Sequence, residues 1–414
     1  MTEDLRLVSR LRQVVGYRGR KRRYAVHLVL FSFVVGALLG VERMAHLEWL
    51  RDDAVLLKWL RLPSWPVRKV FSQGLRYLTD GGRSRLEALV SELGFASLGA
   101  VDSVVVDIDT TAITDHGRAE GSSFGHCGKG RNRRRHHPLV ASVAETRAIV
   151  AAKYRGGANV NGPELLSFLQ LVAGRVRTAL GEGCTMFFRG DSGMWTHAMV
   201  QWMREQGIGF VCAQSMRADI QRILQAADWE ADEDDPDLEF TVVPGPLGTR
   251  LVGVRRLDAD PDAPALGKQL SWCPQYRYQA LVTDRDWEAK DLWRFYNHRA
   301  DCERVFRVGK QVLGLGKLVG RDFASNAAAF LLRALAFNVD LRFQQRAEER
   351  ARAEGRPIRR LGLQWRQFRF YCSPGRLLRE RSRWVLRVPT NPKLVEVWAF
   401  YAPSQLSRAR GAPP

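Results

Sequence analysis

Hydrophobic and polar positions change their spacing near residue 101. Before it, apolar residues recur three and four positions apart, the spacing of helices that bury one face. Segments with this spacing are 6–15, 25–48, 51–60 and 84–93. Pro63 and Pro66 interrupt the pattern, because proline lacks a backbone donor and breaks a helix. Residues 1–100 are therefore predicted to be helical, and 63–78 has the short-helix, turn and basic-helix layout of a helix-turn-helix or of a plain bundle.

After residue 101 the pattern favours strands. The compact apolar run 103–109 is typical of a buried strand, and 139–143 and 148–154 predict two more. A helix over 163–180 begins at Pro163. A strand over 185–189, a helix over 195–205 and a strand over 209–213 follow. This β-β-β-α-β-α-β order predicts a mixed sheet whose first and fourth strands are neighbours and parallel.

The second half of the chain is less regular. Residues 215–276 contain an acidic stretch and two strand-like runs, which predicts a β-rich insertion. A strand over 278–282 leads out of it, and helical stretches follow over 288–312 and 325–350. We therefore expect an α/β fold with five parts. They are a helical N-terminal domain (1–100), a core in two pieces (101–214 and 277–345), the β-rich insertion (215–276) and a basic C-terminal region (346–414).

Composition narrows the possible partners. The 414 residues contain 64 Lys and Arg against 44 Asp and Glu, a formal net charge of +20. Such an excess favours nucleic acid or an anionic membrane surface. The apolar run 25–41 is at the lower length limit for a membrane-spanning helix and contains His27 and Ser32, so we expect a buried helix. The six cysteines form no C-x-x-C pair, which argues against a disulfide scaffold and favours the cytoplasm.

Three acidic residues stand where chemistry is expected. Asp109 ends the first strand and Asp191 ends the fourth, and sites in open α/β sheets gather at the carboxyl ends of strands. In the helical stretch 288–312, Glu303 shares one face with Tyr296, Arg299 and Lys310, within about 60° of arc. Three carboxylates can hold the two divalent ions that phosphoryl transfer requires, and magnesium prefers such oxygen ligands.

These residues also carry a resemblance to a known family. The spacing Y-x2-R-x3-E-x6-K in YNHRADCERVFRVGK resembles the signature of bacterial insertion-sequence transposases of the DDE superfamily. The D-T-T at Asp109 and the R-G-D-S-G at Asp191 are similar to its other two blocks. The later segment GLGKLVGRDFASNAAAFLLRALAFN is similar to its C-terminal helices. The similarity covers roughly residues 100–345, with three blocks in the right order.

The resemblance implies a ribonuclease-H-like mixed sheet and a DNA transposase. Such an enzyme cleaves the ends of an insertion sequence and transfers the strand into target DNA. The implied cofactor is two Mg²⁺ ions, which Mn²⁺ can replace, with no small-molecule cofactor. The implied partner is double-stranded DNA, bound by a homodimer at the bacterial nucleoid. Asp109, Asp191 and Glu303 would bind the metal, and Tyr296, Arg299 and Lys310 would contact DNA phosphate.

Two assignments stay open within this interpretation. Asp107 and Asp109 point to the same face of their strand, so Asp107 is the alternative metal ligand; Asp109 is favoured because Thr110 and Thr111 follow it, as in the family. The family also has a base-stacking tryptophan in its insertion. Trp229 and Trp272 are the candidates, and a core position is the plainer interpretation of each.

Basic segments agree with a DNA partner. The segment HCGKGRNRRRHH (126–137) lies between the first two predicted strands, as a phosphate-contacting tip or a solvated hairpin loop. Its candidate DNA-binding residues are Lys129, Arg131, Arg133, Arg134 and Arg135. Zinc is not expected at its histidines and lone cysteine, because a second cysteine pair is missing. Arginines and aromatics alternate over 359–387, which suits DNA backbone binding with stacking or an ordinary amphipathic region.

Three different functions fit part of the sequence. The run DIDTT also matches the D-x-D-x-T motif of haloacid-dehalogenase-like phosphatases, with Asp107 as nucleophile. That family needs a later acidic pair, which is missing here, and it leaves the basic charge unexplained. A decayed, non-catalytic DNA-binding protein would keep the charge and the fold without the chemistry. A ribonuclease-H-like nuclease would use the same carboxylates to cut DNA without joining it.

Overall fold

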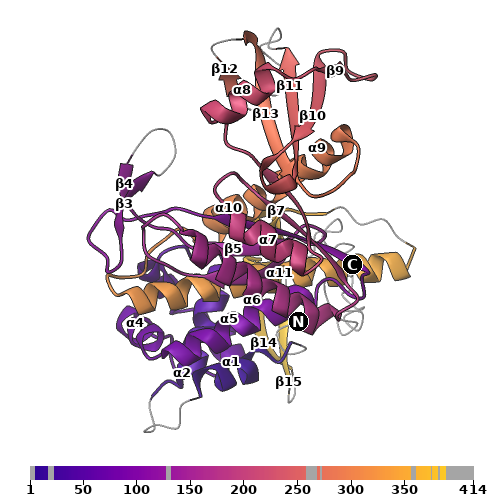
Figure 1. Cartoon of the computed structure of the whole chain (residues 1–414). Helices are drawn as coiled ribbons and strands as arrows, with labels where there is room; N and C mark the ends of the chain where they lie inside the picture. Colours follow the sequence, from indigo (N-terminus) through magenta and orange to yellow (C-terminus); the bar gives the residue numbers. More distant parts are fainter. Residues whose placement is uncertain are drawn as a thin grey trace.

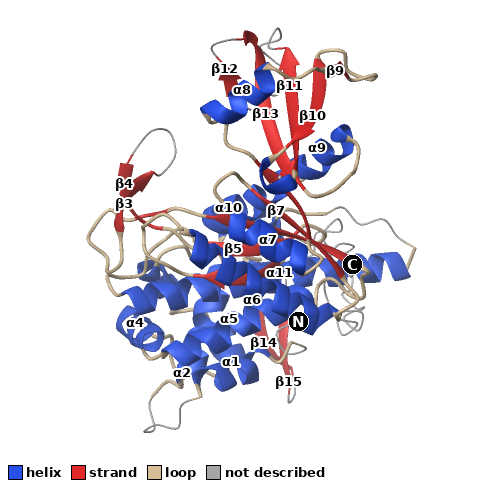
Figure 2. Ribbon diagram, viewed as in Figure 1, coloured by secondary structure: helices blue, strands red, loops and turns tan. Residues whose placement is uncertain are grey.

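A mixed sheet forms the centre of the molecule (Figures 1 and 2). The computed structural model describes residues 5–16, 23–126, 132–257, 268–270, 273–355, 360–373, 375–380 and 383–387. The strand order of the sheet is β6-β5-β1-β7-β8-β13-β11-β10-β9. Strands β1 (Ser103–Thr110) and β7 (Thr185–Gly190) are parallel neighbours, which confirms the prediction for the first and fourth long strands.

The other core strands also follow the predicted order. Strand β5 (Leu139–Val143) pairs antiparallel with β1 and with β6 (Ile149–Lys153), and β8 (Gly209–Ala213) pairs parallel with β7. Helices α6 (Gly162–Leu180) and α7 (His197–Glu205) connect them. Side chains of β1 such as Val104 and Ile108 are fully buried in the same cluster as Phe168 of α6. This burial explains the continuous apolar run of β1.

The β-rich insertion extends the core sheet. It contains α8 (Ala218–Gln225), β9 (Glu230–Ala231), β10 (Leu238–Pro244), a 3-10 turn η2 (Pro246–Gly248), β11 (Arg250–Leu257) and β12 (Lys268–Leu270). Strand β13 (Cys273–Thr283) pairs with β11 along most of its length, and its last three residues pair with β8. The expected boundary at residue 276 thus falls inside one long strand. Figure 1 shows the insertion projecting from the core.

The basic segment between β1 and β5 is structured. Strands β2 (Ile113–Thr114), β3 (Ser123–His126) and β4 (Asn132–His136) form a separate three-stranded sheet in the order β2-β4-β3. Strands β3 and β4 make a hairpin that projects from the core (Figure 1). The interpretation of 126–137 as a loop is therefore wrong for β4, whose run of arginines lacks the apolar alternation that marks a strand.

The N-terminal part is helical, as predicted, but it shares a core with the sheet. Its elements are α1 (Leu7–Val15), α2 (Val26–Leu38), a 3-10 helix η1 (Met44–Leu50), α3 (Ala54–Leu60), α4 (Arg68–Arg76) and α5 (Asp80–Phe95). They form one hydrophobic cluster with residues of β6 and of α11 (Phe323–Ala353). Buried Asn338 of α11 donates to the carbonyls of Val90 in α5 and Ile149 in β6.

The apolar run 25–41, which could have been a membrane-spanning segment, forms the buried helix α2. The helix has 13 residues, of which 11 are buried, and it ends at Leu38 rather than at the expected residue 48. Within the described ranges, no helix combines the length and the apolar character needed to cross a membrane.

The helical stretch predicted over 288–312 is two helices. Helix α9 (Ala289–Asn297) and α10 (Ala300–Val312) meet at His298 and Arg299. Both residues keep right-handed helical dihedral angles, and the backbone N–H groups of Arg299 and Cys302 donate to the carbonyls three residues earlier. No proline or glycine stands at the break, which explains why the apolar pattern predicted a single helix.

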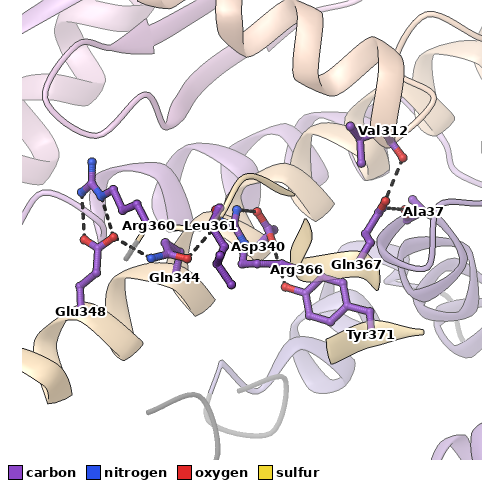
Figure 3. A network of polar contacts seen from close by, with 10 residues as sticks. All are labelled: Ala37, Val312, Asp340, Gln344, Glu348, Arg360, Leu361, Arg366, Gln367 and Tyr371. Atoms are coloured by element: carbon purple, nitrogen blue, oxygen red, sulfur yellow. Dashed lines mark hydrogen bonds and ion pairs between the residues drawn. The ribbon is translucent and has the colours of Figure 1, made fainter. Parts of the chain in front are cut away.

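Described C-terminal residues between 360 and 371 pack back on α11. The C-terminal elements are α12 (Leu363–Arg366), a π-helical turn η3 (Gln367–Tyr371) and the hairpin β14 (Arg376–Glu380) and β15 (Arg383–Arg387). Arg366 makes a buried ion pair with Asp340 of α11, and the Tyr371 hydroxyl donates to the same carboxylate over 2.8 Å (Figure 3). For Arg366 the DNA-binding interpretation is therefore wrong: it stabilises the fold.

Candidate active site

The two aspartates of β1 have different partners. The side chain of Asp107 is 2% exposed, and Arg189 of β7 donates to both of its oxygens, over 2.7 and 2.9 Å. Arg189 also donates to the carbonyl of Phe295 over 2.6 Å. The pair of Asp107 and Arg189 therefore links β1, β7 and α9. Asp109, two residues further along, lies at the carboxyl end of β1.

Asp109 is a buried carboxyl group in a charged surrounding. The Nη2 atom of Arg299 lies 2.9 Å from its Oδ2, and the backbone N–H of Thr110 donates to its Oδ1 over 2.7 Å. The pKa of Asp109 is raised to about 6, mainly by burial; Arg299 lowers it, and the charges of Asp191 and, to a smaller degree, Glu303 raise it. The other two carboxylates singled out in the sequence therefore act electrostatically on Asp109.

Asp191 stands in a tight turn after β7. Its Oδ1 accepts from the backbone N–H of Gly193 over 2.8 Å, and its carbonyl accepts from that of Met194 over 3.0 Å. A side chain at Gly190 would approach the ring of Phe188 to 2.9 Å and the Cβ of Met194 to 3.0 Å. The absence of a side chain at Gly190 thus leaves room for Phe188 and Met194 where β7 ends and the chain turns.

Helix α10 has one buried side, and Glu303 lies outside it. Cys302, Val305 and Phe306 are buried in the cluster shared with the N-terminal helices, while Glu303 is exposed. The spacing of these residues places Glu303 next to the packed face of the helix. The charge of Glu303 is one of those that raise the pKa of Asp109.

The other three residues of the helical signature are Tyr296, Arg299 and Lys310. Tyr296 is 9% exposed, and burial raises its pKa to about 12. Arg299 is 7% exposed; burial lowers its pKa, but Asp109 and its neighbours outweigh this and raise it. Within the described chain, Nε of Arg299 has no hydrogen-bond acceptor. The Nζ of Lys310 donates to the carbonyl of Ala112, just after β1, over 2.9 Å.

The carboxylates are coupled without forming a ready-made metal cluster. In the part of the chain that the structure describes, no three His, Cys, Asp or Glu side chains are gathered closely enough to hold a metal ion. The available donors are nevertheless hard oxygen atoms, which suit divalent ions. The negative charges of Asp191 and Glu303, which raise the pKa of the buried Asp109, also favour a cation there.

The basic hairpin residues have three different environments. Lys129 and Arg131 lie outside the described residues, and Arg133 is exposed. Arg134 is half-buried and donates to the carbonyl of Ser122 over 2.8 Å. Arg135 is 3% exposed and donates to the carbonyl of Gly157 and to Asn159. Its assignment to DNA binding is wrong, because its charge is buried against the protein.

Of the two tryptophans considered for base stacking, the structure describes one. Trp229 is half-buried, with the guanidinium of Arg255 4.4 Å from its ring centroid and Tyr278 edge-on at 5.8 Å. Its Nε1 donates to the carbonyl of Leu224 over 3.2 Å. These contacts favour a packing role. Trp272 lies outside the described residues.

Arg189 is the site residue that sequence reasoning missed. It stands directly before the G-D-S-G of its block, inside a buried strand, and its Cα is in register with that of Asp107. A charged residue in a buried strand needs a partner. The signal was present in FFRGD, but the partner becomes known only when the pairing of β1 with β7 is known.

Comparison with known proteins identifies the family. A family model described as "Transposase DDE domain group 1" matches residues 1–244. The chain belongs to this family. It is a DDE-type DNA transposase, and such enzymes use divalent metal ions. The match includes the N-terminal helices and both aspartates, and it ends before Glu303. It rules out the phosphatase interpretation.

A solved structure shows the same fold. This transposase superposes on piggyBac transposase, described as a synaptic complex with hairpin DNA, with a TM-score of 0.50. The identity is 12%, and the match covers 88% of this chain and 77% of that one. This likeness supports a DDE-type α/β core. No curated protein matches the sequence.

Proposed function

We propose that the transposase cleaves DNA at the ends of an insertion sequence and joins the freed 3′-hydroxyl to target DNA. Asp109, Asp191 and Glu303 would hold Mg²⁺. The observation that carries this proposal is the coupling at Asp109. Besides burial, the charges of Asp191, which follows another strand, and of Glu303, on a helix 194 positions further along the chain, raise the pKa of Asp109.

The choice of Asp109 over Asp107 follows from their partners. Both oxygens of Asp107 are occupied by Arg189, and the pair is almost fully buried. Removing Asp107 from this pair would leave a buried arginine uncompensated, at a cost of several kcal/mol. Asp109 accepts one backbone hydrogen bond and lies within the electrostatic reach of the exposed Glu303, so it is the better ligand.

Bound divalent ions supply charge neutralisation and a more acidic water or hydroxyl group. The protein's own residues position the DNA. Arg299 would shift from Asp109 to a phosphate, since its Nε has no acceptor within the described chain. Lys310, now on the carbonyl of Ala112, would bind a neighbouring phosphate. Tyr296, kept protonated by burial, would donate a hydrogen bond to the same backbone.

Several features support duplex DNA as the partner. The net charge is +20, and phosphate neutralisation dominates non-specific DNA affinity. Helix α4, after the turn with Pro63 and Pro66, exposes Arg68, Lys69 and Arg76. We assign end recognition to this helix. The piggyBac transposase is a synaptic complex with hairpin DNA, and we propose that this chain likewise acts as a homodimer that brings two ends together.

The test replaces one carboxylate. Asp191→Asn should abolish cleavage of a plasmid that carries both element ends, in Mg²⁺ or Mn²⁺, while end binding changes less than about twofold. The matched control is Asp228→Asn, an exposed aspartate of the insertion, which should cleave normally. Cleavage by Asp191→Asn at the rate of the native protein would refute the proposal.

The same assay separates the transposase from the nuclease and the non-catalytic binder. A ribonuclease-H-like nuclease would produce cut ends and no joined product, whereas a transposase yields both. A non-catalytic protein would bind the ends and produce neither. Gel analysis of the DNA after a single incubation distinguishes the three results.

A further inference from the structure

One face of the described part of the β3–β4 hairpin is anchored on the body of the protein. On that face Arg135 donates to the carbonyl of Gly157 and to Asn159. A Cβ at Gly157 would collide with the carbonyl of Arg135 and approach the backbone nitrogen of Ser123 to 2.6 Å, so the two backbones lie in direct contact. The hairpin is therefore held rigidly against the body of the protein at this point.

The other face of the hairpin presents an aromatic ring to solvent. Phe124 is 69% exposed and lies directly opposite Arg134 across the strand pair. The guanidinium carbon of Arg134 is 5.5 Å from the ring centroid. Arg134 is fixed by hydrogen bonds from its Nη2 and Nε to the carbonyl and Oγ of Ser122, over 2.8 and 3.2 Å. A cation is thus held beside an open ring face.

The exposed ring of Phe124 offers an apolar surface to which a ligand can bind. Burial of such a side chain against a ligand stabilises the complex, because apolar surface is removed from water. The surrounding sequence, KGRNRRRHH, contains only basic charges, which favours an anionic partner over another protein surface. Nucleic acid can bind both groups at once, because a base stacks on the ring of Phe124 and a phosphate binds the guanidinium of Arg134.

The position of the hairpin relates it to the proposed chemistry. Strand β2, which begins four residues after Asp109, pairs with β4. The path from Asp109 through β2 and β4 to Phe124 spans at most about 30 Å, judged from strand rise and spacing. One turn of B-form DNA measures about 34 Å. A DNA end bound at Asp109 would therefore have its first turn within reach of Phe124.

We propose that Phe124 and Arg134 form a stacking platform for an unpaired DNA base close to the cleavage site. The proposal rests on the proposed function only in taking DNA as the substrate. Phe124 would stack on the base, and Arg134 would bind the adjoining phosphate. The platform would thereby favour DNA that is opened near the cut over fully paired DNA.

The test measures binding and needs no cleavage, so its outcome is independent of the metal site. The probe is a duplex with a short unpaired segment that contains 2-aminopurine, compared with the same duplex fully paired. Phe124→Ala should weaken binding of the opened duplex about tenfold, from a stacking contribution of roughly 1–3 kcal/mol, and leave the paired duplex unchanged. The 2-aminopurine fluorescence should be quenched by the native protein and not by the variant.

Two further variants sharpen the result. Phe124→Leu keeps an apolar side chain without the aromatic ring and should behave like Phe124→Ala, which also covers the case in which the alanine variant fails to fold. Leu171→Ala removes a 43% exposed apolar side chain of α6 and should bind both probes normally. The salt dependence of binding should stay unchanged in Phe124→Ala, because stacking releases no counterions.

Three results would overturn the proposal. One is equal loss of affinity for opened and paired duplexes, which would mean a backbone contact only. Another is unchanged binding and quenching in both Phe124 variants. The last is the loss of protein self-association in Phe124→Ala with unaltered DNA binding, which would assign the ring to an interface between protein copies.

Discussion

At the scale of single residues, two carboxyl groups of one strand have opposite roles. Asp107 and Asp109 share a face of β1, yet Asp107 is neutralised by Arg189 and Asp109 faces other carboxylates. The sequence motif D-x-D-T-T contains both, and it could not separate them because the difference lies in residues 82 positions away. Burial and partner, rather than the motif, decide which one is available to a cation.

This difference predicts opposite phenotypes. Asp107→Asn should lower the free energy of unfolding by about 3–5 kcal/mol, because the change leaves the charge of Arg189 buried without its counter-ion. Asp109→Asn should abolish DNA cleavage and leave the fold intact. Denaturant unfolding of both variants, read by circular dichroism, checks this. A stable Asp107→Asn protein that cleaves no DNA would reverse the assignment.

The raised pKa of Asp109 also predicts how stability depends on pH. Its folded-state pKa of about 6 is above the unfolded value of 3.8. The stabilising contribution of its proton is therefore complete below about pH 4 and is lost as the pH rises through 6. With a chelator present, Asp109→Asn should match the native melting temperature at pH 4 and exceed it by a few degrees at pH 8. A constant difference across this range would contradict the electrostatic account.

At the scale of elements, helix α10 links the proposed metal site to the DNA contacts. Its buried side holds Cys302 and Phe306, and its open side carries Glu303 and Lys310. The bond from Lys310 to the carbonyl of Ala112 fixes this helix to the end of β1. The arrangement of Tyr296, Arg299, Glu303 and Lys310 on one face stays a prediction, because the helical stretch is divided at residues 298–299.

Lys310→Ala should weaken binding of end DNA and lower the slope of log affinity against log salt by about one. The physical reason is the loss of one cation that displaces counterions from phosphate. Fluorescence anisotropy at several salt concentrations measures the slope. If affinity falls while the slope stays the same, Lys310 acts only by holding α10 to the loop after β1.

The C-terminal segment predicts a second effect, on stability. Arg366 is 8% exposed in its pair with Asp340, whereas Arg360 is 72% exposed in its pair with Glu348. Arg366→Met should destabilise the protein by about 3–5 kcal/mol, and the matched control Arg360→Met by less than about 1 kcal/mol. Guanidinium chloride unfolding compares them. Equal effects would mean that the segment is not held to α11 as Figure 3 shows.

At the scale of the whole molecule, local patterns predicted the core better than its surroundings. The parallel pair β1 and β7 was predictable, because two buried apolar runs joined by helical crossovers leave few topologies. The Arg-rich strand β4 was not, since its apolar pattern is absent and its pairing with β3 and β2 supplies the order. The ion pair of Asp107 with Arg189 depends on sheet register in the same way.

Long-range packing also removed two boundaries that the sequence suggested. The N-terminal helices share a hydrophobic cluster with α11 and β6, and β13 belongs both to the insertion and to the core sheet. The composition change at residue 100 marks a change from helices to strands, whereas residue 276 lies inside the strand β13. The molecule should therefore carry the insertion and the active-site edge on one continuous sheet.

The most direct measurement is a structure of the transposase with an end-DNA duplex and Mn²⁺, using the anomalous signal of manganese. The account predicts peaks bonded to Asp109, Asp191 and Glu303, with Arg299 moved from Asp109 to a DNA phosphate and Asp107 still paired with Arg189. Manganese bound through Asp107, or bound without Glu303, would contradict it.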